Sequence, residues 1–204
     1  MSRLRGIYAI TDNRLTPETT LLEQVEQALA GGVRMLQYRD KQSPAELRQQ
    51  QASALARLCH DYDALLIIND DVELARSSKA DGVHLGQDDE GISHAREALG
   101  HQAVIGASCY NRIEFAEHAR KAGASYVAFG RFFPSQTKPN AIQAELDILE
   151  QARHLGLPVC AIGGITWQNA SSIISAGADM IAVVDGIFGQ PDIRKAASDL
   201  ASLF

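Results

Sequence analysis

The chain has 204 residues, 46% of them hydrophobic, and a formal net charge of −6. This length suffices for a substantial core, so we expect one domain that spans residues 1–204. The acidic balance and the lack of long basic runs argue against nucleic acid as the main partner, and no apolar run approaches the ~20 residues of a membrane span.

The three cysteines are far apart and odd in number, so they match neither a zinc pattern nor a disulfide framework. The N-terminal residues run directly into a strand-like segment, with no recognisable signal peptide. Both features favour a reducing cytoplasm as the setting of the protein. Assembly into a homo-oligomer is left open.

Short apolar segments alternate with segments of helical periodicity from one end of the chain to the other. The segments typical of strands are 6–11, 33–36, 65–68, 82–85, 104–108, 126–129, 159–162 and 180–184. The segments typical of helices are 16–30, 43–58, 72–78, 91–99, 112–122, 141–155, 169–176 and 192–204.

Two helix starts carry local signals. Thr16 is a candidate cap followed by proline, and Ser43 and Glu46 have the spacing of a capping box. A recurring Ala-Gly pair precedes the strands that begin near residues 33, 126 and 180, and it marks the turn from helix to strand.

Eight short apolar strands, each followed by a helix, predict a single-domain (β/α)8 TIM barrel. The strands are continuously apolar, as expected where both faces of a parallel sheet are buried. A doubly wound open sheet is the alternative, although such sheets more often have five or six strands.

The polar residues collect at the predicted carboxyl ends of the strands, where barrels of this kind bind ligands. Gln37, Arg39 and Lys41 follow the second strand, and alternation puts their side chains on one face. An arginine fork beside a mobile lysine charge suits an anion with several oxygens. A solvated strand edge is the alternative interpretation.

Asp70 and Asp88 end neighbouring predicted strands, so their carboxylates can face one rim of the barrel. Two carboxylates near a phosphate group favour a hard cation, most plausibly Mg2+. The alternative is that each aspartate caps the helix that follows it.

A second anion site is predicted around residues 134–139, where Ser135, Thr137 and Lys138 lie within four residues. Gly163-Gly164 allows the backbone to approach an anion, and barrels often bind phosphate after strands seven and eight. An ordinary turn is the alternative for the first segment. The two sites together would fit a diphosphate and a monophosphate.

His84 lies within a strand and is more simply interpreted as a packed interior histidine than as a catalytic base. Cys109 and Cys160 are expected to fill the core or rim rather than to act as nucleophiles. No Ser-His-Asp or Cys-His order stands out.

The chain resembles the thiamine-phosphate synthase family along nearly its whole length. Seven short motifs carry the resemblance, in the right order and at the right strand ends: Tyr8-Ala9-Ile10-Thr11-Asp12, Gln37-Tyr38-Arg39-Asp40-Lys41, Ile68-Asn69-Asp70-Asp71, His84-Leu85-Gly86-Gln87-Asp88, Gly106-Ala107-Ser108, Phe133-Pro134-Ser135-Gln136-Thr137-Lys138 and Ala161-Ile162-Gly163-Gly164-Ile165.

The resemblance implies a transferase that joins 4-amino-2-methyl-5-hydroxymethylpyrimidine diphosphate to 4-methyl-5-(2-hydroxyethyl)thiazole phosphate, giving thiamine phosphate and diphosphate. It implies Mg2+ at Asp70 and Asp88, and catalytic roles for Arg39, Lys41, Ser108 and Lys138. By position, the residues implied for the pyrimidine diphosphate are Gln37, Tyr38, Arg39, Asp40, Lys41, Asn69, Ser108 and Lys138, and those implied for the thiazole phosphate are Ser135, Gln136, Thr137, Gly164, Val184 and Asp185.

Two positions depart from the family pattern. Ser135 stands where the family often has threonine, which keeps the hydroxyl, and Val184-Asp185 stands where it often has Ile-Ser. A carboxylate repels phosphate, so only a backbone contact is expected at Asp185.

Three rival functions remain at this point. A thiazole tautomerase of the same superfamily would not need a diphosphate and Mg2+ set. A non-catalytic sensor of a phosphorylated metabolite would release no diphosphate. A phosphosugar isomerase would need a glutamate or histidine base aimed at a substrate carbon, and no strand end supplies a clear glutamate.

Overall fold

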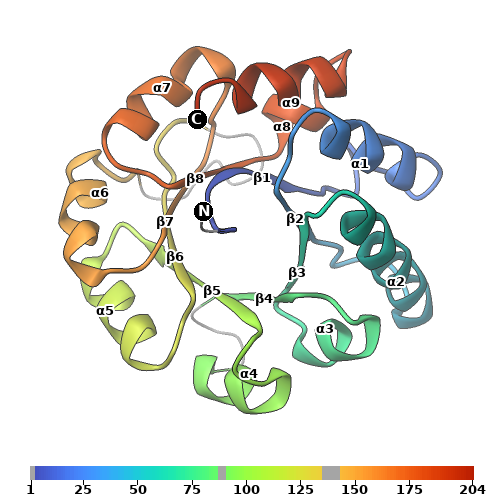
Figure 1. The fold of residues 1–204 in the computed structure, drawn as a ribbon, viewed down its shortest axis with the longest axis horizontal. Coiled ribbons are helices and arrows are strands. Elements are labelled where there is room, and N and C mark those ends of the chain that lie inside the picture. Colours follow the sequence, from blue (N-terminus) through green and yellow to red (C-terminus); the bar gives the residue numbers. More distant parts are fainter. Residues whose placement is uncertain (1–2, 87–90, 135–142) are drawn as a thin grey trace.

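The fold was analysed in a computed structural model that describes residues 3–86, 91–134 and 143–204. Eight parallel strands close into a barrel in sequence order, β1 beside β2 and onward to β8, which pairs with β1. Figure 1 shows the strands at the centre with the helices in a ring around them. The predicted (β/α)8 fold is confirmed.

Each strand is four to seven residues long and almost wholly buried. The strands are β1 (Gly6–Ile10), β2 (Met35–Tyr38), β3 (Leu65–Asn69), β4 (Gly82–Leu85), β5 (Val104–Tyr110), β6 (Tyr126–Phe129), β7 (Val159–Ile162) and β8 (Met180–Val183).

The helices follow the strands around the outside of the barrel. They are α1 (Leu21–Ala30), α2 (Ala45–Asp61), α3 (Val72–Ser78), α4 (Ile92–Leu99), α5 (Ile113–Lys121), α6 (Asp147–Ala152) with the 3-10 turn η1 (Arg153–Leu155), α7 (Trp167–Ser175), α8 (Asp185–Phe188) and α9 (Ile193–Ala201). In the described part of the chain, no helix combines the length and the apolar composition that crossing a membrane would require.

Side chains on the strands alternate between two cores, as the pleat requires. One core lies between strands and helices and includes Leu36, Leu66 and Val127. The other fills the barrel interior and includes Tyr8, Tyr126 and several small or flexible residues. The barrel is therefore packed, and a ligand can enter only at its mouth.

The first helix begins later than predicted, at Leu21 instead of near Thr16. The Thr16 hydroxyl accepts from the backbone N–H of Asp12 and donates to its carbonyl, so this side chain closes the loop instead of capping a helix. Residues 17–20 then form a turn before the helix starts.

The predicted capping box at the second helix is absent. The helix is preceded by Pro44 and has no side-chain cap. Asp40 instead accepts hydrogen bonds from the backbone N–H groups of Gln42 and Ser43, which shapes the turn from upstream.

The helix predicted over 141–155 is shorter, because residues 143–145 are not helical. The backbone N–H of Ala144 donates to the carbonyl of Arg131 at 2.8 Å, which holds this segment against the loop after β6. The short helix α8 was not predicted, since four residues give no helical periodicity.

Candidate active site

One large cavity opens at the carboxyl ends of the strands and has a volume of about 340 Å3. We call it the barrel-mouth cavity. Its walls come from strand ends and loops that are distant in sequence and adjacent around the barrel. The lining residues that bear on function are Tyr8, Arg14, Gln37, Arg39, Asn69, His84, Ser108, Arg131, Gly164, Val184 and Asp185.

The residues after β2 divide between two faces. Gln37 and Arg39 line the barrel-mouth cavity, as their alternation predicts. Tyr38 points to the outer side, where its hydroxyl donates to Gln51 of α2 at 2.6 Å. Burial raises the pKa of Tyr38, and the charge of Asp40 raises it further.

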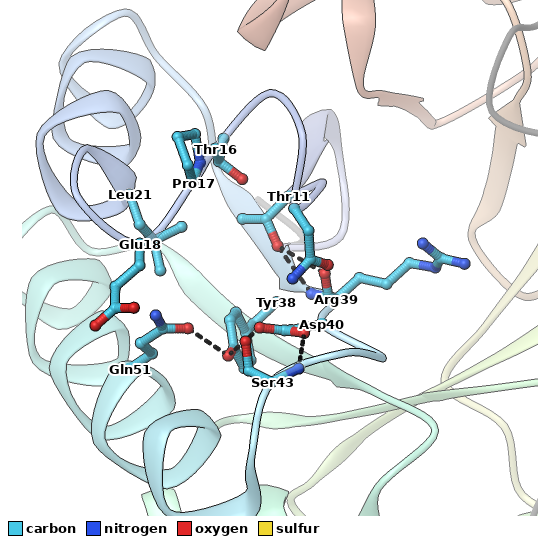
Figure 2. Close-up of a pocket in the computed structure, with 11 residues that line it drawn as sticks. Thr11, Thr16, Pro17, Glu18, Leu21, Tyr38, Arg39, Asp40, Ser43 and Gln51 are labelled. Carbon is cyan, nitrogen blue, oxygen red and sulfur yellow. Dashed lines mark hydrogen bonds between the residues drawn. The ribbon is translucent and has the colours of Figure 1, made fainter.

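Figure 2 shows that outer side, a small pocket between the first two βα units. Tyr38, Asp40 and Ser43 lie together there, whereas the Arg39 side chain extends away from them. Of the residues implied for the pyrimidine diphosphate, Gln37, Arg39, Asn69 and Ser108 line the barrel-mouth cavity. Tyr38, Asp40 and Lys41 are not part of its lining, and Lys138 lies outside the described residues.

The position of Arg39 is fixed through its backbone. Its N–H donates to the hydroxyl of Thr11 at 2.9 Å, and Thr11 is only 2% exposed. The turn that follows is held by Asp40. Burial tends to raise the pKa of Asp40, but hydrogen bonds from Ser43, Gln42 and Asn13 outweigh burial and lower it to about 2. Asp40 is thus a structural carboxylate that remains ionised.

Asp70 lies beside the predicted diphosphate residues. Its Oδ2 is 2.7 Å from the Lys41 ammonium and accepts from the Asn69 side-chain amide at 2.6 Å. Asp70 has a φ of +66°, a left-handed conformation that aspartate tolerates better than most residues. Its neighbour Asp71 has a different role, because it caps α3 by accepting from the N–H of Leu74.

The predicted metal site is described only in part, because Asp88 lies outside the described residues. Among the residues that are described, no three His, Cys, Asp or Glu side chains cluster in a way that could hold a metal. Of the two aspartates predicted to bind the metal, Asp70 is the one in the described part of the chain. Its carboxylate is a hard oxygen donor of the kind that suits Mg2+.

Ser108 and His84 meet at the cavity floor. Ser108 Oγ lies 2.9 Å from His84 Nε2, and His84 Nδ1 lies 2.8 Å from the Tyr126 hydroxyl. The Tyr126 hydroxyl is 2.9 Å from that of Tyr8, which accepts from the Gln37 amide at 2.7 Å. His84 is packed in the interior, as the sequence favoured, and it also faces the cavity.

The loops after β7 and β8 form the opposite wall. Gly164 has a φ of +63°, and a Cβ there would lie 2.3 Å from the carbonyl oxygen of Pro134. Val184 and Asp185 also line this wall. Ser135, Gln136, Thr137 and Lys138 belong to the predicted phosphate loop but lie outside the described residues.

Sequence reasoning missed several cavity residues. Tyr8 sits in an apolar strand, and Arg14 and Arg131 sit in loops that carried no recognised pattern. The rule that residues just after barrel strands face the site would have flagged both arginines. Tyr8 could not be flagged, because its polar partners come from other strands.

The cysteines agree with the interpretation as fillers. All three are free and buried. Cys160 borders the cavity, and burial raises its thiol pKa, as it raises that of Cys109 to about 12. A neutral buried thiol is a poor nucleophile.

Comparison with known proteins identifies the family of the chain. The family described as thiamine monophosphate synthase matches residues 7–187. A thiamine-phosphate synthase of Marinobacter nauticus is 55% identical over 94% of this chain and 87% of its own, and one of Thiobacillus denitrificans is 53% identical over 98% and 94%. A solved thiamine phosphate pyrophosphorylase from Pyrococcus furiosus superposes with a TM-score of 0.89 at 37% identity, covering 98% of this chain and 96% of that one. The chain therefore belongs to the thiamine monophosphate synthase family of transferases.

Proposed function

We propose that the protein joins hydroxymethylpyrimidine diphosphate to hydroxyethylthiazole phosphate, forming thiamine phosphate and diphosphate. The observation that carries this proposal is the division of the barrel-mouth cavity. Arg39, Asn69 and Ser108 line one side, and the glycine-containing loops after β7 and β8 line the other. Such a cavity offers one wall to each substrate.

The reaction requires stabilisation of a departing anion more than proton transfer. The bond between the pyrimidine methylene carbon and the diphosphate oxygen breaks, and its electron pair leaves with the diphosphate. The electron-rich aminopyrimidine supports the resulting cation, and the lone pair of the thiazole nitrogen forms the new carbon–nitrogen bond. No base is needed for bond formation.

Cationic side chains would stabilise the leaving group as its charge develops. Arg39 offers a planar fork at the cavity, and Lys41 a point charge at the rim. Lys138 would add a third charge from the loop after β6. Preorganised charges of this kind commonly supply the largest part of catalysis.

Mg2+ would be held by Asp70 and Asp88 with water and diphosphate oxygens. The oxygen donor and rim position of Asp70 fit a hard cation, although its Oδ2 is paired with Lys41. Mg2+ would neutralise diphosphate charge. Lys41 would transfer its hydrogen bond from Asp70 to a phosphate oxygen when the substrate and the metal bind.

The pyrimidine itself would lie over the cavity floor. Gln37 and Ser108 would contact it there, and Asn69 would contribute from the end of β3. Tyr38 and Asp40 would support this site indirectly, since their side chains face the outer pocket and hold the turn that carries Arg39.

The thiazole phosphate would bind at the opposite wall. Gly164 permits close backbone approach, and Val184 borders the same space. Ser135, Gln136 and Thr137 would add hydroxyl and amide donors. The carboxylate of Asp185 would repel phosphate, so a contact there would come from its backbone. We place the enzyme in the cytoplasm, in keeping with three free cysteines.

The test is incubation of the purified full chain with both phosphorylated precursors and Mg2+, with assay of thiamine phosphate. Product that is lost with EDTA and restored by excess Mg2+ would support both the reaction and the metal. Intact precursors at the end of the incubation would overturn the proposal and direct attention to tautomerase activity.

A further inference from the structure

One large aromatic side chain is exposed at the mouth of the barrel. Tyr110, the last residue of β5, lines the barrel-mouth cavity and is 43% exposed. The other large hydrophobic side chains that are exposed in the described part of the chain are Leu22, Leu146 and Trp167, and none of them lines this cavity. An aromatic ring left partly in water at a ligand cavity is a candidate contact for the ligand.

The backbone of Tyr110 has an unusual conformation. Its φ is +54°, in the left-handed region that bulky residues rarely adopt. The N–H of Arg112 donates to the carbonyl of Cys109 at 3.0 Å, so residues 109–112 form a tight turn with Tyr110 at its second position. Turns with a positive φ at that position are dominated by glycine, asparagine and aspartate. Local backbone preference therefore does not explain a tyrosine here.

The strand that carries Tyr110 directs its ring toward the cavity. The Tyr110 carbonyl accepts from the N–H of Gly130 at 2.8 Å, which fixes the end of β5 against the loop after β6. The pairing of β5 with β6 shifts register between Ser108 and Tyr110, and bulges beside active sites commonly redirect a side chain. Cys109 is buried in the core between strands and helices, whereas Ser108 and Tyr110 both line the cavity.

The inward residues of β5 form successive layers from the barrel interior to the mouth. At Gly106, a Cβ would lie 2.1 Å from Cζ of Tyr126, so the interior is filled at that level. Ser108 comes next, at the cavity floor, and Tyr110 lies one layer further toward the mouth. A flat ligand that rests on the floor over Ser108 would therefore meet the Tyr110 ring.

We propose that Tyr110 contacts the ligand and selects an aromatic ring above Ser108. Aromatic side chains favour stacked or edge-to-face contacts with other rings, and such contacts contribute to affinity beyond the area that they bury. The unfavourable backbone conformation is then retained because it aims the Tyr110 ring at the ligand. This inference rests on the proposed function, in which the ring would be the aminopyrimidine of the diphosphate substrate.

The test compares binding of the pyrimidine diphosphate with binding of inorganic diphosphate, which lacks the ring. Calorimetric titration of the full chain with Mg2+, and without the thiazole phosphate, gives both dissociation constants. Tyr110→Asn removes the ring and introduces a residue that tolerates a positive φ. We expect its Kd for the pyrimidine diphosphate to rise at least ~10-fold, the scale of one base–aromatic contact, while its Kd for inorganic diphosphate stays unchanged. Tyr110→Phe should retain both affinities, because it keeps the ring.

Lys79→Asn is the matched control for the backbone. Lys79 has a φ of +59° at the end of α3, and it does not line the cavity. Both asparagine variants should keep or raise the melting temperature, because asparagine adopts a positive φ more readily than the residue that it replaces. Only Tyr110→Asn should lose affinity for the pyrimidine diphosphate, so a damaged fold would not account for that loss.

The outcomes separate this inference from the proposed function. If the parent protein binds the pyrimidine diphosphate more tightly than inorganic diphosphate and Tyr110→Asn loses that difference, Tyr110 recognises the ring. If Tyr110→Asn keeps the difference, the inference is wrong and the proposed function stands. If the parent protein shows no difference, the ring contributes nothing to binding, and both the inference and the proposed function are contradicted.

A spectroscopic measurement checks the contact directly. The ring-proton NMR signals of Tyr110, identified by their absence in Tyr110→Phe, should shift when the pyrimidine diphosphate is added and should stay in place with inorganic diphosphate. Unchanged signals at saturating pyrimidine diphosphate would overturn the contact even if the enzyme makes thiamine phosphate.

Discussion

The ammonium of Lys41 lies 2.7 Å from Oδ2 of Asp70, so a proposed diphosphate-binding cation and a proposed metal-binding carboxylate are paired with each other. Asn69 donates to the same oxygen. A carboxylate offers about four lone-pair sites on its two oxygens, so a metal could bind Asp70 beside these donors. In this account Lys41 leaves Asp70 for a phosphate oxygen when the substrate binds.

Lys41→Met should impair substrate binding without destabilising the fold. The Lys41 side chain is 58% exposed, and exposed ion pairs contribute only about 0–1 kcal/mol. We expect the free energy of unfolding to change by less than ~1 kcal/mol, while the KM for the pyrimidine diphosphate rises at least ~10-fold. Lys195→Met is a matched control, since Lys195 pairs with Asp199 at the same distance on α9. Equal KM values in both variants would rule out the role of Lys41.

Asp70→Asn should raise the Mg2+ concentration needed for half-maximal activity at least ~10-fold, because an amide oxygen is a weaker ligand for a hard cation. Asp88→Asn should act in the same direction. Asp71→Asn is the control: asparagine still caps α3, so its Mg2+ titration should match that of the parent protein. Coincident titrations for all the variants would remove both aspartates from the metal site.

Arg39→Ala and Lys138→Ala should each lower kcat at least ~100-fold, the scale of losing one preorganised charge. Arg76→Ala provides the comparison, because the exposed Arg76 side chain pairs with Glu73 within α3. Single-turnover kinetics would separate chemistry from binding. Near-parent rates in the two cavity variants would contradict charge stabilisation of the leaving group.

The stability of the fold should depend on Asp40 at acid pH. The folded pKa of Asp40, about 2, lies below its ordinary value of 3.8. A lowered pKa stabilises the fold above the ordinary value, and this contribution disappears as the pH falls from about 5 toward 2. Urea unfolding at pH 5 and pH 3 should show a larger loss for the parent protein than for Asp40→Asn. Parallel losses would show that Asp40 makes no such contribution.

Gly164→Ala should disturb the thiazole phosphate wall. Alanine there would combine an unfavourable φ with a Cβ 2.3 Å from the Pro134 carbonyl. Gly156→Ala is the matched control, with a φ of +66° and no described atom within 4 Å of a Cβ. Only Gly164→Ala should raise the KM for the thiazole phosphate, and it should lose more stability than the roughly 1 kcal/mol expected from φ alone. Similar values for both variants would remove the close approach from the account.

The barrel could be predicted from sequence because its signals are local and repeated. Continuous apolar runs such as 126–129 and 159–162 gave strand bounds that the structure confirms, and α3 was predicted to the residue. The misplaced start of α1 has a local cause that the cap pattern alone did not indicate: the predicted cap Thr16 is engaged by the backbone of Asp12, four residues upstream.

The candidate site was less predictable because it depends on which strands face each other across the barrel. Alternation correctly separated Gln37 and Arg39 from Tyr38, whereas motif membership alone placed Tyr38 and Asp40 among the substrate contacts. The partnership of Tyr8 with Tyr126 joins residues 118 positions apart, and no sequence pattern announces it.

The central claim is that diphosphate departure is coupled to carbon–nitrogen bond formation at this cavity. The most direct measurement is the amount of thiamine phosphate and of diphosphate released by the same sample, with and without the thiazole phosphate. The account predicts equal amounts of both products with the two substrates present, and abolition of both by EDTA. Diphosphate release without matching thiamine phosphate, or thiamine phosphate formed equally well in EDTA, would contradict it.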